Sequence, residues 1–148
     1  MIARPVFLLL ALAATPAAFA DDLSGVWRFT TEPTAFNCTI SGEMTIKPSN
    51  SLKHDCTFTA VQTCTERPPA EMHTEQSCVA IQIGKLVSIK SKLEKLTSVV
   101  PATMFDSVGY APDDFSLTLN ASGNEMLGRY SSHRTSPAKF WRKRELVS

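Results

Sequence analysis

The chain has 148 residues, of which 43% are hydrophobic, and its 15 Lys and Arg nearly balance its 14 Asp and Glu. A net charge of +1 argues against a dedicated nucleic-acid-binding protein, because such proteins concentrate positive charge. No stretch is long and apolar enough to predict a transmembrane helix. We therefore expect neither a nucleic-acid partner nor a membrane-spanning segment.

The first 20 residues have the pattern of a signal peptide. Arg4 supplies a positive charge, residues 6–14 form an apolar run, and Ala18-Phe19-Ala20 matches a small-x-small cleavage site. We expect cleavage after Ala20 and export to the periplasm or the medium. Residues 21–148 then form one domain that is large enough for its own core.

Residues 36–47 alternate apolar and polar side chains, which is typical of a strand with one buried face. The same period of two recurs along the chain. It predicts eight strands, at 27–31, 36–47, 55–64, 71–83, 84–96, 113–120, 125–132 and 138–147. Residues 89–98 also fit a short helix, and that alternative stays open. The longest connection, at 97–112, is the best candidate for a functional loop.

Short strands with one apolar face and short turns indicate an all-β fold, a single antiparallel meander. Closure of the meander into a small barrel removes the exposed edges that an open eight-stranded sheet would leave. A barrel of about eight strands has room inside for its own side chains or for one small ligand.

Four cysteines in an exported chain indicate two disulfides. If the second and third strands form a hairpin, Cys38 lies opposite Cys64, and the next hairpin places Cys56 opposite Cys78. Pairing Cys64 with Cys78 would leave Cys38 and Cys56 about eight residues out of register, beyond disulfide reach. We therefore favour Cys38–Cys64 and Cys56–Cys78 among the three possible pairings.

The segments "LSGVW" (23–27) and "FWRKR" (140–144) resemble the ends of calycin-type barrels, the group of lipocalins, avidins and Inh-type protease inhibitors. The resemblance implies that Gly25 and Trp27 open the first strand, that Trp27 closes the barrel floor and that Arg142 packs over its ring. It also implies ligand binding or the inhibition of secreted hydrolases. A separate family of bacterial envelope proteins is the second interpretation.

Our first functional hypothesis is a carrier that holds a small apolar or amphipathic molecule in the barrel or at its mouth. The candidate lining residues are large side chains on inward positions: Phe29, Met44, Phe58, Phe115, Leu117, Met126 and Tyr130. Because these side chains are bulky, they could instead fill the interior as a solid core.

The second hypothesis is an interaction or hydrolase-inhibitor module that presents a loop and a basic rim to an envelope protein. The loop is 97–112. From Met126 onward the sequence contains six Lys and Arg but only one acidic residue, Glu145. Apart from Arg142, which is named above, these cations form the basic rim that we expect: Arg129, Arg134, Lys139, Lys143 and Arg144. These positions also suit the water-facing sides of two strands.

No catalytic motif is present, so we expect a protein that is not an enzyme and carries no cofactor or metal. His54, His73 and His133 lack metal-ligand spacing, and there is no Gly-x-Ser-x-Gly elbow and no Gly-rich phosphate loop. The pair Asp113–Asp114 is interpreted as a turn that starts a strand.

Overall fold

The computed structural model of the protein describes residues 22–34, 37–66, 70–100 and 110–144. The predicted signal peptide, Phe36 and most of the 97–112 connection lie outside the described residues. All regular structure in the described part is β, so it contains no helix that could cross a membrane.

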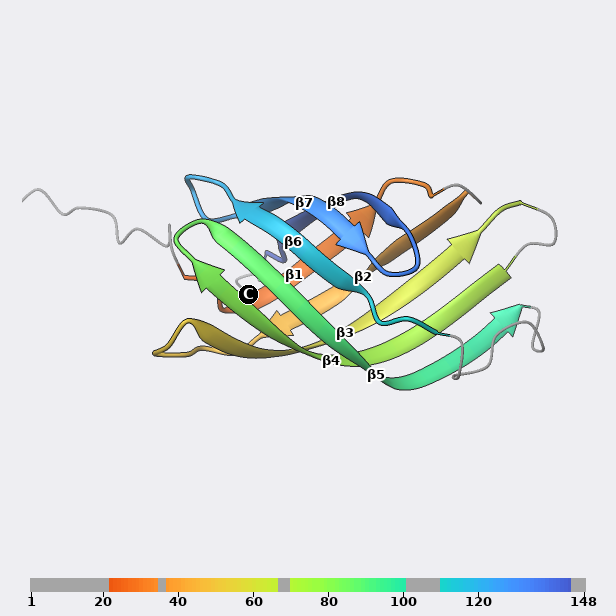
Figure 1. Cartoon of the computed structure of the whole chain (residues 1–148), viewed down its shortest axis with the longest axis horizontal. Coiled ribbons are helices and arrows are strands. Elements are labelled where there is room, and N and C mark those ends of the chain that lie inside the picture. Colours follow the sequence, from red (N-terminus) through yellow and green to blue (C-terminus); the bar gives the residue numbers. More distant parts are fainter. Residues whose placement is uncertain (1–21, 35–36, 67–69, 101–109, 145–148) are drawn as a thin grey trace, which may run out of the picture.

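Eight antiparallel strands form a closed barrel in simple chain order, and β8 pairs with β1 to complete it (Figure 1). The all-β barrel predicted from the sequence is confirmed. The strands are β1 (Gly25–Thr31), β2 (Cys38–Ile46), β3 (Lys53–Cys64), β4 (Ala70–Ile83), β5 (Leu86–Val100), β6 (Asp114–Leu119), β7 (Glu125–Ser131) and β8 (Thr135–Arg142).

The barrel has two ends that differ in their contents. The β2–β3, β4–β5 and β6–β7 turns lie together at the end where β1 begins, which we call the Trp27 end (Figure 1). The β7–β8 turn and the start of β6 lie at the opposite end, which we call the Asp113 end.

Both predicted disulfides are present. Cys38 pairs with Cys64 across β2 and β3, and Cys56 pairs with Cys78 across β3 and β4. Each bridge joins residues that are direct partners in the strand register. The two bridges therefore fix three consecutive strands, while β5 to β8 contain no cysteine.

Residues 89–98 are a strand, and β5 continues to Val100, so the following connection is shorter than predicted. β5 has two register shifts against β4, and one of them explains why the helix alternative fitted. At this shift Glu94 has no partner, which places Leu93 opposite Gln76 and Leu96 opposite Thr74. The apolar residues are thus three positions apart on one face, a spacing that imitates a helix.

The last strand begins earlier than predicted, at Thr135, and ends at Arg142; residues 145–147 of the predicted strand lie outside the described residues. It includes Pro137, whose ring removes a ladder donor. Glu32 donates its backbone N–H to the Pro137 carbonyl, but Pro137 cannot return the bond. The Ser136 hydroxyl donates to the Glu32 carbonyl at 2.6 Å instead, so the proline costs no hydrogen bond here.

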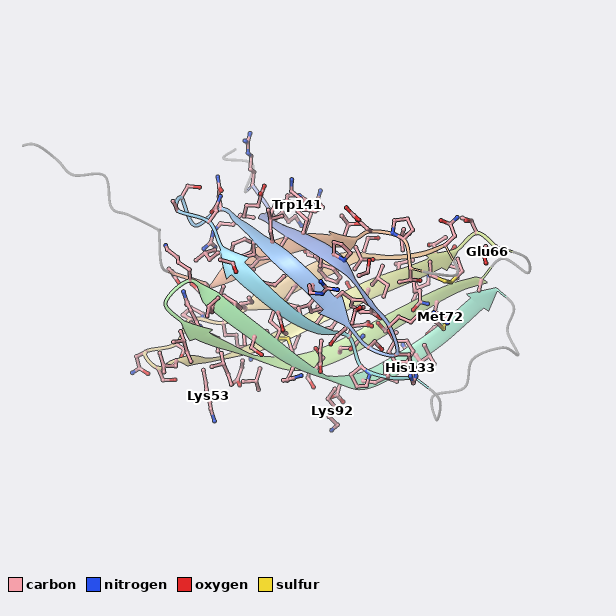
Figure 2. The ribbon with its side chains drawn as sticks, turned by 45° about the horizontal axis from the view of Figure 1, so that its top comes forward. Lys53, Glu66, Met72, Lys92, His133 and Trp141 are labelled. Atoms are coloured by element: carbon pink, nitrogen blue, oxygen red, sulfur yellow. A yellow bond between two sulfur atoms is a disulfide. The ribbon has the colours of Figure 1, made fainter. Side chains whose placement is uncertain are left out.

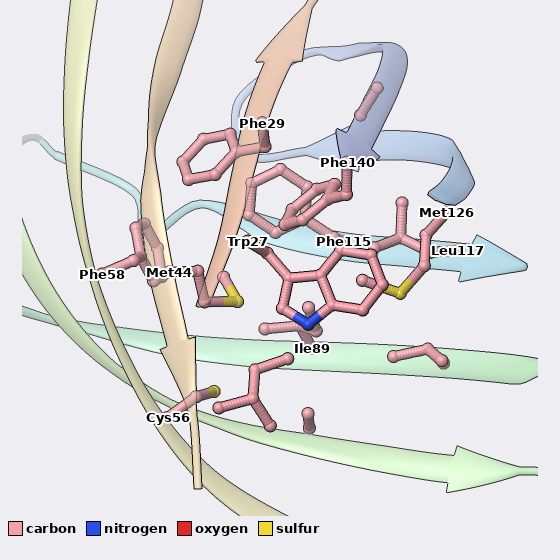
Figure 3. Close-up of a cluster of buried hydrophobic side chains, with 14 of the residues drawn as sticks. Trp27, Phe29, Met44, Cys56, Phe58, Ile89, Phe115, Leu117, Met126 and Phe140 are labelled. Atoms are coloured by element: carbon pink, nitrogen blue, oxygen red, sulfur yellow. The ribbon is translucent and has the colours of Figure 1, made fainter. Parts of the chain in front are cut away.

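The centre of the barrel is an aromatic core around Phe29 (Figure 3). Its ring stacks on Phe140 at 4.9 Å between centroids and meets Phe58 and Phe115 edge-on. The space for it comes from Gly42, its partner on β2, because a Cβ at position 42 would lie 2.7 Å from the Phe29 ring and 2.0 Å from the Thr59 carbonyl. Only glycine fits there.

We expect each disulfide to contribute to stability. The bridges close loops of 26 and 22 residues along the chain, so the double variants Cys38→Ala/Cys64→Ala and Cys56→Ala/Cys78→Ala should each lose about 3 kcal/mol of unfolding free energy. Urea unfolding measures this loss against the oxidised wild type, and the reduced wild type, which lacks both bridges, is the control. An unchanged urea midpoint in either variant would contradict the expectation.

Candidate functional site

The Trp27 end of the barrel is closed by a contact between its first and last strands. Trp27 is fully buried and donates its indole N–H to the Leu23 carbonyl at 3.0 Å. The Arg142 guanidinium lies 4.3 Å from the centroid of the Trp27 ring. Arg142 also donates to the carbonyls of Gly123 (2.7 Å), Ser24 (2.6 Å) and Asp22.

We call these contacts of Trp27 and Arg142 the plug. The plug brings together three segments that are remote in sequence. Partial burial lowers the pKa of Arg142, and the nearby Asp22 carboxylate acts in the opposite direction. The pKa of Asp22 is itself lowered, first by the backbone N–H that Ser24 donates to it. Gly25 adopts a φ of 124°, and a Cβ there would lie 3.0 Å from the Arg142 guanidinium, so glycine leaves room for the plug.

The seven candidate lining residues come together, but as a packed cluster, and all of them except Tyr130 are labelled in Figure 3. None is more than 5% exposed. Phe115 contacts Phe140 at 5.0 Å, Tyr130 at 5.8 Å and Phe58 at 6.2 Å between ring centroids. Their side chains therefore occupy the space that a ligand would need in the middle of the barrel.

A buried polar cluster lies at the Asp113 end. The Asp113 side chain is fully buried and accepts hydrogen bonds from Gln76 Nε2 (2.7 Å), Tyr110 Oη (2.6 Å) and Tyr130 Oη (2.8 Å). Its backbone N–H donates to Gln76 Oε1 at 3.0 Å, and Gln76 Nε2 also donates to Thr74. The cluster thereby ties β4, β7 and the segment 110–113 across the interior.

Burial dominates the electrostatics of this cluster. It raises the pKa of Asp113, although the hydrogen bonds from Tyr110, Gln76 and Tyr130 act in the opposite direction. Burial and the neighbouring carboxyl raise the pKa of both tyrosines. The tyrosines therefore stay protonated at neutral pH and serve as donors to Asp113.

The sequence interpretation of Asp113 as a simple turn residue missed this cluster. A signal was available, because Asp113, Phe115, Leu117 and Leu119 share the inward parity of β6, and all four are buried. An acid on an inward position of a barrel needs buried donors. Its partners come from β4, β7 and a loop, and no sequence pattern identifies which inward residues meet.

The basic residues do not gather at one end. Arg134 lies in the β7–β8 turn at the Asp113 end, whereas Lys143 and Arg144 follow β8 at the Trp27 end. Lys139 pairs with Glu125 at 3.3 Å and Lys143 with Glu43 at 3.0 Å. The set is thus a stripe along the outer face of β7 and β8, and part of its charge is neutralised by acids.

Trp141 lies on the outer face of β8, whereas the described end of the predicted functional loop belongs to the buried cluster. Trp141 points outward and is 36% exposed, between Arg28 on β1 and Glu125 on β7, while its neighbour Phe140 is fully buried (Figure 2). Of the connection 97–112, the described part after β5 begins at Tyr110, which belongs to the buried cluster. Residues 101–109 lie outside the described residues.

Neither the comparison with models of known protein families nor the comparison with curated proteins finds a match. Within the described residues, no group of three or more His, Cys, Asp and Glu side chains is arranged to hold a metal ion. His54 contacts the Lys47 carbonyl and His73 contacts Glu71, which places the two rings in separate local interactions. The buried contacts described above tie strands together.

We expect Arg142→Ala to lower the free energy of unfolding by about 3 kcal/mol, because it removes a cation–π contact and three charge-assisted hydrogen bonds. Arg142→Lys keeps the charge but cannot reach three carbonyls at once, so it should recover less than half of the loss. Urea unfolding measures both, and Arg129→Ala is the control for an exposed arginine. Equal stability of Arg142→Ala and the control would contradict the role of the plug.

We expect burial of Asp113 to make stability depend on pH. Between the ordinary aspartate pKa of 3.8 and the raised pKa of the folded state, the unfolded chain ionises while the folded protein keeps its proton. The wild type should therefore lose stability relative to Asp113→Asn as the pH rises through this window, and then level off. Urea unfolding from about pH 3 to about pH 8 measures the difference. The variant Asp55→Asn, which removes an exposed carboxylate, reports the contribution of net charge. If the wild type instead gained stability relative to Asp113→Asn as the pH rises, the pKa of Asp113 would be lowered in the folded protein, which would contradict the expectation.

Proposed function

We propose that the protein is a non-enzymatic binding module that engages an envelope component through its outer surface. The observation that carries this proposal is the filled interior: the seven large inward side chains pack against one another and are at most 5% exposed. A barrel filled in this way acts as a rigid support. Binding residues are then expected on the outer face and on the turns.

The disulfides support an oxidising, extracytoplasmic compartment, because thiols stay reduced in the cytosol. Export through the predicted N-terminal signal belongs to the same proposal. Rigidity also favours a binding role, since a surface that is already ordered loses little conformational entropy when a partner binds. The closed sheet and the two bridges supply that order.

A carrier of a small amphipathic molecule at the Asp113 end is the second candidate. The observation in its favour is that several inward side chains at this end are small: Thr31, Thr74, Ser136 and Ala138 are all buried. A ligand here would bond to Gln76 and Asp113 in place of Tyr110. The carrier needs the hydrogen bond of Tyr110 to Asp113 to open, whereas the binding module does not.

Native mass spectrometry of the protein, purified without denaturation from the cells that make it, tests the two candidates. We expect the mass of the chain with two disulfides and no bound molecule. As a control, the same sample is measured after mild organic extraction. An additional mass that leaves on extraction would contradict the binding-module proposal and support the carrier.

A further inference from the structure

Exposed aliphatic side chains gather on one part of the outer surface. Leu52, Ile83, Leu86 and Leu127 are between 52% and 64% exposed. Ile83 is the register partner of Leu86, and Thr118 lies between Leu86 and Leu127 in the adjoining strands. With the half-buried Ile81, these residues form what we call the apolar patch: Leu52, Ile81, Ile83, Leu86 and Leu127.

The patch is built from turns as well as strands. Leu52 lies in the β2–β3 turn, and its carbonyl accepts the backbone N–H of Gln82, which brings that turn against the end of β4. Ile83 and Leu86 flank Gly84 and Lys85 at the β4–β5 turn. Both turns project from the Trp27 end (Figure 1). Several aliphatic side chains therefore reach beyond the body of the barrel at one end.

Three cations border the apolar patch, and one acid, Asp55, follows Lys53 on the same outer face of β3. Lys53 is the register partner of Ile81 and points outward (Figure 2), Lys85 lies between Ile83 and Leu86, and Arg129 is two residues after Leu127 on the same face of β7. Among the described residues, Lys53 and Arg129 make no ion pair. The nearest acid in the register of β7, Glu125, is paired with Lys139 at 3.3 Å.

The combination of aliphatic side chains and cations indicates which kind of partner the patch can bind. A two-fold dimer through the patch would bring Lys53, Lys85 and Arg129 of one copy close to the same residues of the other, which is repulsive. An anionic lipid surface offers both parts that the patch requires: an apolar layer for the aliphatic side chains and negative headgroups for the cations. Long lysine side chains keep their charge at headgroup level while their stems lie in the apolar layer.

We propose that the apolar patch and its cations dock the protein on an anionic lipid surface. This inference rests on the proposed function, because it names the envelope component that the outer surface binds. The β2–β3 and β4–β5 turns enter the headgroup region side by side. The barrel stays outside the hydrocarbon layer, with its Trp27 end toward the membrane.

Sedimentation with lipid vesicles tests the proposal. The full folded protein should bind vesicles that contain phosphatidylglycerol and bind vesicles of phosphatidylcholine alone at least about tenfold more weakly. Raising the salt from about 0.1 M to about 1 M should weaken the binding, because the Debye length falls from about 10 Å to about 3 Å. Trp141, which is partly exposed, is available to follow the binding by fluorescence.

Two double variants separate the apolar and the electrostatic parts. Ile83→Ser/Leu86→Ser should reduce partitioning by about tenfold, because it removes two apolar side chains from the contact. Lys53→Glu/Lys85→Glu should reduce it by about a hundredfold and abolish its salt dependence. The matched control is Lys92→Glu/Lys95→Glu, which makes the same change of charge on a distant part of β5 and should bind as the wild type does. Near-ultraviolet circular dichroism and the disulfide mass confirm that each variant is folded.

Each outcome decides the proposal. If Lys53→Glu/Lys85→Glu and the control Lys92→Glu/Lys95→Glu lost vesicle binding equally, the loss would come from net charge alone, and the proposal would be overturned. Absence of binding to either vesicle would also overturn it, while native mass spectrometry decides separately whether the interior holds a ligand. Self-association that Ile83→Ser/Leu86→Ser abolishes would assign the patch to a second copy of the chain and overturn the lipid proposal.

Discussion

The pairing of β1 with β8 is the constraint on which the rest of the structure depends. It turns a linear meander into a barrel without free edges at this seam, and it places Phe29 against Phe140 in the centre. The Trp27–Arg142 contact then closes the floor. Without this pairing the aromatic core would lack one wall, and the long sheet would expose its apolar face to water.

The way in which the interior is filled decides where binding can occur. Phe29 needs the missing side chain of Gly42 and the small Ala60 beside it, so the inner wall is shaped around its own residues. At the other end Asp113 is enclosed by donors from opposite walls. Since both regions are satisfied by internal contacts, the groups still available to a partner lie outside, where Leu52, Ile83 and Leu86 meet water.

Much of the fold could be predicted from the sequence because period-two alternation is local. It indicated eight strands and, through the hairpins that these strands form, placed Cys38 opposite Cys64 and Cys56 opposite Cys78. It was wrong about the ends of β5, which has two register shifts against β4, and about the start of β8, where the Ser136 hydroxyl takes the place of a proline donor. The cluster around Asp113 and the apolar patch were missed for another reason. Both arise where distant strands meet, and alternation reports which face a residue occupies but not its neighbours on that face.

The plug at Arg142 also has a consequence for how the chain folds. Arg142 bonds to Ser24, which lies 118 positions earlier, so the contact that closes the floor joins the two ends of the domain. Contacts of such long range must pay a large loop-closure entropy before they stabilise anything, and proteins dominated by them fold slowly. A ribosome-bound chain that lacks β8 cannot close its barrel. Closure of the barrel is therefore delayed until β8, the last strand, has left the ribosome.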